Sequence, residues 1–176
     1  MAIRKATTTD AKSIAAVFNG FVVRHPAAGI LPSWTEATVL QSIAHPDTTV
    51  AVNVDGKVVT AFCTWFRDDP KGARIRLTSV AWVASLDSLK PDMLFVFTLW
   101  IAANTTATEQ ENIWALDHPM AAITERRFAA GLQLNTKAWI EKGPEMLRLI
   151  VDLPDLAAVY QAKLSDTVTW DRMYTV

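Results

Sequence analysis

The period of the apolar positions changes several times along the chain, and each change marks the boundary of an element. Residues 2–6 alternate and predict a short opening strand. The apolar residues that follow recur at helical spacing on one face: Ile14, Val17, Phe18 and Phe21. This spacing predicts an amphipathic helix that begins near Ala11, with Thr9 or Asp10 as its N-cap.

The clearest local signal is a hairpin at residues 48–66. Two alternating runs of β-branched and aromatic residues flank Asp55 and Gly56, a pair favoured where a tight turn needs positive φ. Residues 74–84 follow a polar loop and predict a third strand of the same sheet. A short helix is predicted at 34–45, between the first helix and the hairpin.

The remaining chain continues to alternate between strands and helices. The predicted elements are a helix entered through Pro91, a strand at 113–119, a helix at 120–132, two strands within 134–153, a helix at 154–164 and an extended tail. This order predicts an α+β fold (α/β/α) in which a mixed central sheet carries helices on both faces. We expect residues 1–153 to form one domain, with residues 154–176 packing as a helix and tail on that domain or on a partner.

Composition gives no support to several classes of partner, although a local basic patch remains open. The 176 residues suffice for one domain with a sizeable core, and an apolar fraction of 51% with 20% charged residues is typical of a folded chain. A net charge of −1 gives no electrostatic footprint for nucleic acid or an anionic membrane. The N-terminus has no apolar leader, and the most apolar window, 93–103, is about half of what a bilayer crossing needs. We therefore expect a soluble, intracellular (cytoplasmic) protein, with the lone Cys63 buried as a small hydrophobe.

The predicted order of elements resembles the GCN5-related N-acetyltransferase (GNAT) fold over nearly the whole chain to about residue 152. The resemblance rests on four stretches: "IRKATTTDAKSIAAVFNGF", "VAVNVDGKVVTAFCTWF", "RIRLTSVAWVAS" and "HPMAAITERRFAAGLQL". It implies an acetyltransferase-like site in which the strand starting at Arg76 splays from its neighbour. Backbone groups of Val80 and Trp82 would then hold the pantetheine arm of acetyl-CoA, with Lys90 on its phosphates. An amine would approach near Ser79.

Two features depart from the resembled pattern. Family members follow that strand with a glycine-rich loop whose bare N–H groups meet the diphosphate, whereas this chain has "SLDSLKPD". Asp87 and Asp92 add negative charge there, and Pro91 removes one donor. The family also places a tyrosine four residues before a helix-ending glycine to protonate the thiolate. Counting back from Gly131 gives Arg127, whose guanidinium is a poor proton donor near neutral pH.

Other chemistry has limited support in the sequence. Asp117 and His118 follow a predicted strand end, where His118 could act as a base, although Asp-His-Pro is also a good turn sequence. Ser79, Asp117 and His118 are therefore the candidate catalytic residues. We expect His25 and His45 to be solvated in loops before prolines, so that no metal site forms.

Two functions follow from these observations. The first is a degenerate GNAT-like domain that acts as a non-catalytic binding or assembly module without a cofactor. A short likeness in "AAGILPSWTEAT" and "RRFAAGLQL" resembles GNAT-like virion or assembly proteins of bacteriophages, so a place in a phage particle is part of this hypothesis. Trp170, Met173 and Tyr174 in the tail would then anchor to another protein subunit, because aromatic side chains concentrate at interfaces. The alternative is an acetyl-CoA-dependent N-acetyltransferase acting on an amine.

Overall fold

A computed structural model of the chain describes residues 2–26, 33–116, 121–122 and 138–165. The strands of its described part form one seven-stranded sheet in the order β1-β2-β3-β4-β5-β7-β6. They are β1 (Ala2–Lys5), β2 (Thr48–Asp55), β3 (Val58–Phe66), β4 (Arg74–Trp82), β5 (Glu109–Ala115), β6 (Ala138–Lys142) and β7 (Met146–Asp152). Neighbours are antiparallel except β4 and β5, which run parallel, so the sheet is mixed as predicted.

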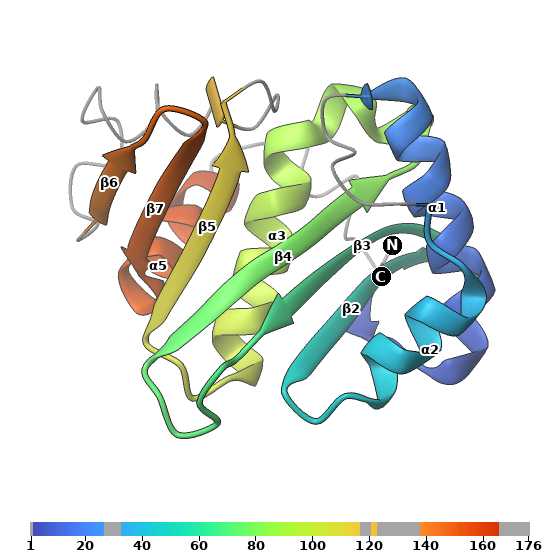
Figure 1. Cartoon of the computed structure of the whole chain (residues 1–176), viewed down its shortest axis with the longest axis horizontal. Helices are drawn as coiled ribbons and strands as arrows, with labels where there is room; N and C mark the ends of the chain where they lie inside the picture. Colours follow the sequence, from blue (N-terminus) through green and yellow to red (C-terminus); the bar gives the residue numbers. More distant parts are fainter. Residues whose placement is uncertain (1, 27–32, 117–120, 123–137, 166–176) are drawn as a thin grey trace.

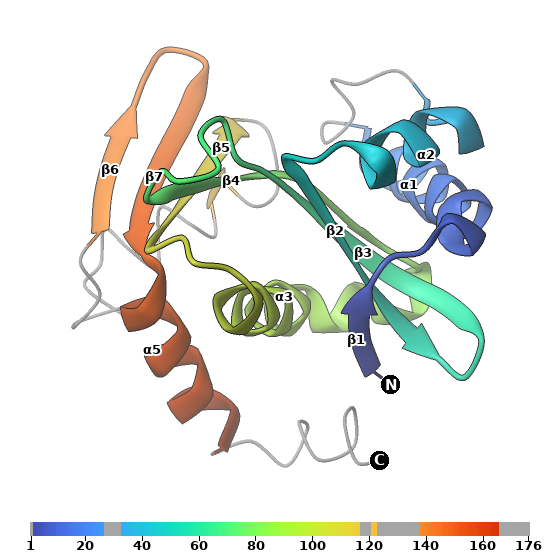
Figure 2. The ribbon, with the colours of Figure 1, turned by 90° about the horizontal axis from the view of Figure 1, so that it is seen from below.

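Helices cover both faces of this sheet (Figure 1, Figure 2). They are α1 (Ala11–Arg24), α2 (Glu36–Ala44), α3 (Lys90–Asn104) and α5 (Leu153–Ser165), with short 3-10 helices η1 (Thr8–Asp10) and η3 (Ala84–Leu89). Helices α1 and α2 pack on one face over β2 and β3, whereas α3 and α5 pack together on the other. The predicted fold class, an α+β arrangement in which a mixed central sheet carries helices on both faces, is confirmed.

The start of α1 is confirmed in position: the helix begins at Ala11, and Asp10 is its N-cap residue. The Asp10 side chain makes no capping hydrogen bond to α1, because a 3-10 turn with Thr7 as its own N-cap precedes the helix. The Asp10 carboxylate instead accepts hydrogen bonds from the Thr7 amide at 2.7 Å and from the Arg4 guanidinium at 2.7 and 2.8 Å. The pair with Arg4, helped by Thr7, lowers the pKa of Asp10 to about 2.

The hairpin of β2 and β3 is confirmed. Gly56 has φ of 60°, the left-handed conformation that a residue with a side chain rarely adopts. The last strand pair, β6 and β7, also flanks Gly143 and Pro144 as the sequence predicts. Ahead of the hairpin, the Thr35 hydroxyl caps α2 by accepting from the Thr38 amide at 3.1 Å.

Aromatic side chains fill the core on both faces of β3. On the α1 side, Phe62 packs near Phe18 and Trp34, whose rings stack with centroids 4.3 Å apart. On the α3 side, the Trp65 ring lies near Phe97 and Trp100. Trp65, Trp82 and Trp114 are buried, while Trp100 is half-buried. Cys63 is fully buried as expected, which raises the pKa of its thiol.

Strand β5 begins four residues before the predicted strand. The residues ahead of Ile113 are mostly polar and predict no strand, yet Glu109 already pairs with β4. Three successive polar side chains are buried in this strand, and they hide the apolar period that would reveal it: Gln110, Glu111 and Asn112.

Several predicted features lie outside the described residues. These are the turn with Asp117 and His118, most of the helix at 120–132 with Arg127 and Gly131, and the tail with Trp170, Met173 and Tyr174. Helix α5 begins at Leu153, one residue earlier than predicted, and packs against α3. Among the described helices, none is long and apolar enough to cross a membrane.

The opening between β4 and β5

The parallel pair of β4 and β5 is closed at one end and open at the other. Pairing runs from Arg74 with Glu109 to Leu77 with Asn112, which we call the closed half. Beyond it, residues 79–82 of β4 pair with β3, and residues 113–115 of β5 pair with β7. Figure 1 shows the two strands diverging along this second stretch, which we call the open half.

A β-bulge at Thr78 lies where the strands part. On β3, Thr64 and Trp65 are consecutive, but their partners on β4 are Ser79 and Leu77. Thr78 is therefore an extra residue on β4, and it directly follows the last residue paired with β5. Because a bulge bends its strand and increases the local twist, it turns β4 away from β5 at this point.

The open half leaves main-chain groups of β4 without a partner among the described strands. The Val83 amide donates to the Thr60 carbonyl of β3 at 2.9 Å, so Val83 faces β3. Successive residues of a strand direct their main-chain groups to opposite sides. The N–H and C=O groups of Val80 and Trp82 therefore point toward the opening, and no described strand pairs with this edge.

The last turn of α1 lies at the far end of this edge. The Arg24 guanidinium donates to the carbonyl of Trp82 and, at 2.9 Å, to that of Gly20. The expectation that His25 is solvated is wrong: it is half-buried, with its ring 4.6 Å from Phe21 and 6.4 Å from Trp82. Aromatic packing against the end of β4 draws the imidazole inward.

His45, by contrast, is exposed, and its ring nitrogen accepts from the Asp47 amide at 3.2 Å. In the part of the chain that the structure describes, no three His, Cys, Asp or Glu side chains are grouped to hold a metal ion.

The connection after β4 is helical from its start. The 3-10 helix η3 begins at Ala84, directly after β4 and Val83, and the Leu86 amide donates to the Val83 carbonyl at 3.0 Å. No long loop is present there to surround a diphosphate. The first amides of such a turn have no partner within it, which leaves those of Ala84 and Ser85 pointing out, both in exposed residues. Pro91 is the second residue of α3, the first-turn position predicted for it.

These residues fit the two parts of acetyl-CoA unequally. The edge at Val80 suits a pantetheine arm, whose amides need main-chain partners. Two amides at Ala84 and Ser85 are fewer than a glycine-rich loop supplies, and no glycine lies between Val83 and Asp92. The diphosphate end is therefore less well provided for than the pantetheine end.

Below the opening, a buried carboxylate joins three strands. Glu111 of β5, 1% exposed, accepts from Arg76 of β4 at 2.7 Å and from Arg148 of β7 at 2.6 Å. Burial alone would raise the pKa of Glu111, but the hydrogen bonds from both guanidinium groups outweigh it and leave the pKa below its usual value. The network fixes the three strands just under the point where β4 turns away.

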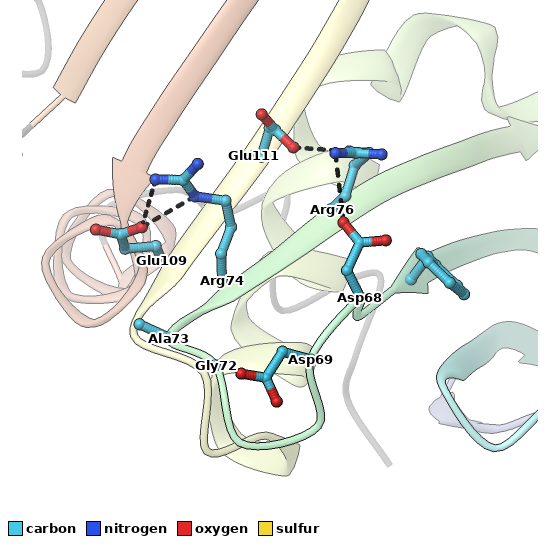
Figure 3. Close-up of a pocket in the computed structure, with 9 residues that line it drawn as sticks. Asp68, Asp69, Gly72, Ala73, Arg74, Arg76, Glu109 and Glu111 are labelled. Atoms are coloured by element: carbon cyan, nitrogen blue, oxygen red, sulfur yellow. Dashed lines mark hydrogen bonds and ion pairs between the residues drawn. The ribbon is translucent and has the colours of Figure 1, made fainter.

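An open cavity of about 300 Å³ lies beside this network on the closed half. Figure 3 shows its charged lining, in which Arg76 also reaches Asp68 at 3.6 Å and Arg74 pairs with Glu109 at 3.0 Å. Both side chains of the second pair are well exposed, 43% and 39%, unlike Glu111. Each arginine in the lining is matched by a carboxylate, so the cavity has no surplus of positive charge for an anionic ligand.

The structure brings three of the predicted site residues together. Ser79, Val80 and Trp82 lie in the open half of β4, and Lys90 is the first residue of α3. Sequence reasoning missed Thr78 and the pair of arginines around Glu111. One signal for the bulge is present, since Thr78 and Ser79 are adjacent polar residues that interrupt the alternation of residues 74–77.

Comparisons with known proteins give a fold and no sequence family. A scan of the sequence against protein-family models and a search of curated sequences gave no match. Solved structures do match. A probable GNAT-family acetyltransferase from Chromobacterium violaceum superposes with a TM-score of 0.62 at 14% identity, covering 87% of each chain.

Two further neighbours were solved with a thioester or thiol ligand. The PaiA N-acetyltransferase from Thermoplasma acidophilum, in complex with coenzyme A, has a TM-score of 0.60 at 13% identity and covers 86% of this chain and 98% of its own. The GNAT-like decarboxylase GphF, in complex with isobutyryl-CoA, has a TM-score of 0.61 at 14% identity, with 87% and 100% covered. The chain thus has the GNAT fold. The comparisons lend no support to a phage origin or to a non-catalytic role.

Proposed function

We propose that the protein binds an acyl-CoA, acetyl-CoA in the simplest case, between β4 and β5 and transfers its acyl group to an amine. One observation carries this proposal: the bulge at Thr78 opens the sheet and leaves main-chain groups of Val80 directed into the gap. Neighbours of the same fold hold coenzyme A or isobutyryl-CoA, which supports a ligand of this class. The predicted alternative is therefore favoured over the non-catalytic module.

The chain's own groups would bind and orient the thioester. The Val80 amide and carbonyl can donate to and accept from the amides of a pantetheine arm, as a neighbouring strand would. The amides of Ala84 and Ser85 offer two donors to phosphate oxygens, with Lys90 at the start of α3 as a further cation. An acyl thioester supplies an activated carbonyl carbon, and the amine would reach it near Ser79. Water, Asp117 or His118 would take its proton.

Titration with acetyl-CoA and with free coenzyme A tests the binding step. We expect a Kd tighter than about 100 μM, equivalent to roughly 5.5 kcal/mol, and a rise in melting temperature. In a two-dimensional NMR spectrum, the amides of Val80, Trp82, Ala84 and Ser85 should shift most. The Thr60 amide, on the neighbouring strand, serves as the internal control. Heat without shifts at these four amides would place the ligand elsewhere.

A non-catalytic assembly module is the second candidate, favoured by the glycine-free connection at η3. No heat and no shift on titration would support it. The tail residues Trp170, Met173 and Tyr174 would then be the contact with another subunit. Replacing all three by alanine should abolish self-association, or capture by a purified partner, without lowering the melting temperature.

A further inference from the structure

A hydroxyl group with a fixed orientation lies at the point where β4 leaves β5. Thr78 of the bulge donates its hydroxyl hydrogen to the Thr64 carbonyl at 3.1 Å, and the oxygens of the two hydroxyls are 2.7 Å apart. A threonine hydroxyl has only one hydrogen. With that hydrogen on the Thr64 carbonyl, the bond between the two hydroxyls runs from Thr64 to Thr78.

This arrangement makes the Thr78 oxygen an acceptor only. Its hydrogen is used, and one of its two lone pairs receives the Thr64 hydrogen, which leaves one lone pair. Among the described residues, no other group donates to it. Thr64 is 3% exposed, whereas Thr78 is exposed, so the remaining lone pair can be reached from solvent while its support is buried.

The hydroxyl lies on the side of the sheet that carries α1 and α2. Residues directly across a strand pair share a face, and side chains alternate along a strand. Phe62 packs against Phe18 of α1, so Thr64, two residues further along β3, lies on the same face. Thr78 bonds to Thr64 on that face. It therefore stands beside the edge at Val80 that the proposed function gives to the thioester.

We propose that Thr78 is a positioning and specificity-determining residue for the acceptor, and that it selects primary amines. This rests on the proposed acyl transfer. A primary amine donates one N–H to Thr78, which aims the nitrogen lone pair at the thioester carbon. The C–N bond forms, the C–S bond breaks and its electron pair leaves with sulfur. The second amine hydrogen is lost as a proton to water, and the thiolate takes a proton from solvent.

The same geometry disfavours acceptors with one hydrogen. A secondary amine or an alcohol must lose its only N–H or O–H in the reaction, so it has none left to keep on Thr78. A protonated amine has no lone pair with which to attack the thioester, and the Thr78 hydroxyl does not remove its proton. Thr78 thus favours a neutral primary amine, because this acceptor still carries one N–H in the amide product and can keep its hydrogen bond to Thr78.

The test compares Thr78→Val, which keeps the shape and removes the hydroxyl, with Thr78→Ser, which keeps the hydroxyl. Thr108→Val, at an exposed threonine before β5, is the matched control. Release of coenzyme A from acetyl-CoA is followed with ethanolamine, putrescine, benzylamine and lysine. The N-methyl derivative of the amine acetylated fastest is then assayed. Binding of acetyl-CoA is titrated for every variant.

We expect Thr78→Val to lower kcat/KM for the primary amine about tenfold and to bring the ratio of primary to N-methyl amine toward one. Affinity for acetyl-CoA should stay within twofold, and Thr78→Ser and Thr108→Val should behave as the wild type. Unchanged kcat/KM in Thr78→Val would overturn the role of Thr78 but not the proposed function. A loss of acetyl-CoA affinity as large as the loss of kcat/KM would do the same. Wild-type protein that binds acetyl-CoA but acetylates no amine would also overturn it. Wild-type protein that does not bind acetyl-CoA would overturn the proposed function as well.

Discussion

The closed and open halves of the β4–β5 pair use the same two strands for opposite purposes. In the closed half, parallel pairing and the bonds from Arg76 and Arg148 to Glu111 hold the strands at a fixed spacing. In the open half, one extra residue at Thr78 turns β4 away, so that no strand of the described part of the chain adjoins its main-chain groups on that side. The closed half therefore holds the two strands together immediately below the point where they separate.

Removing the buried carboxylate should have the largest effect. Glu111→Ala leaves two guanidinium groups without their shared acceptor, and we expect a loss of about 3 kcal/mol in the free energy of unfolding. Glu109→Ala, two residues earlier on the same strand and also paired with an arginine, should cost under about 0.5 kcal/mol, because that pair is exposed. Urea unfolding measures both. Equal losses would mean that burial of Glu111 contributes nothing beyond pairing.

Deleting Thr78 should convert the open half into a regular strand. Without it, Ser79 would follow Leu77 and still face Thr64, so the alternation of faces is kept on both sides of the deletion. We expect a folded protein whose affinity for acetyl-CoA falls at least tenfold, about 1.4 kcal/mol, because β4 no longer turns from β5. Calorimetric titration gives the affinity, and circular dichroism checks the fold. Undiminished binding would show that the bulge does not create the site.

The sequence predicts the fold better than the site, for reasons visible in individual residues. The hairpin at Gly56 is local: a positive φ and two alternating runs suffice to specify it. Strand β5 depends on distant residues, because Glu111 is buried with arginines from two other strands bound to it. A sequence read along one strand does not reveal those partners.

The opening was predicted only through resemblance. A bulge adds one residue to a strand without altering its composition, and the adjacent polar pair of Thr78 and Ser79 is its sole trace in the sequence. The hydrogen bond that orients the Thr78 hydroxyl joins residues 14 apart, so it follows from the register of β3 against β4. Register is a tertiary property that no local pattern contains.

Acid should weaken the closed half before it affects the open half. The pKa of Glu111 is lowered in the folded protein, so its contribution to stability is complete above its ordinary pKa of 4.5 and is lost as pH falls toward the folded value. We expect the wild type to lose more stability than Glu111→Gln as pH falls below 4.5, measured by urea unfolding at each pH. Protonation of Asp10, whose pKa is about 2, also lowers the free energy of unfolding in acid. Asp10 is present in both the wild type and Glu111→Gln, so its effect cancels in the comparison. The difference between wild type and Glu111→Gln therefore isolates the carboxylate under the opening. A constant difference across this range would mean that Glu111 does not titrate differently in the folded and unfolded chains, and that its guanidinium partners hold it by geometry alone.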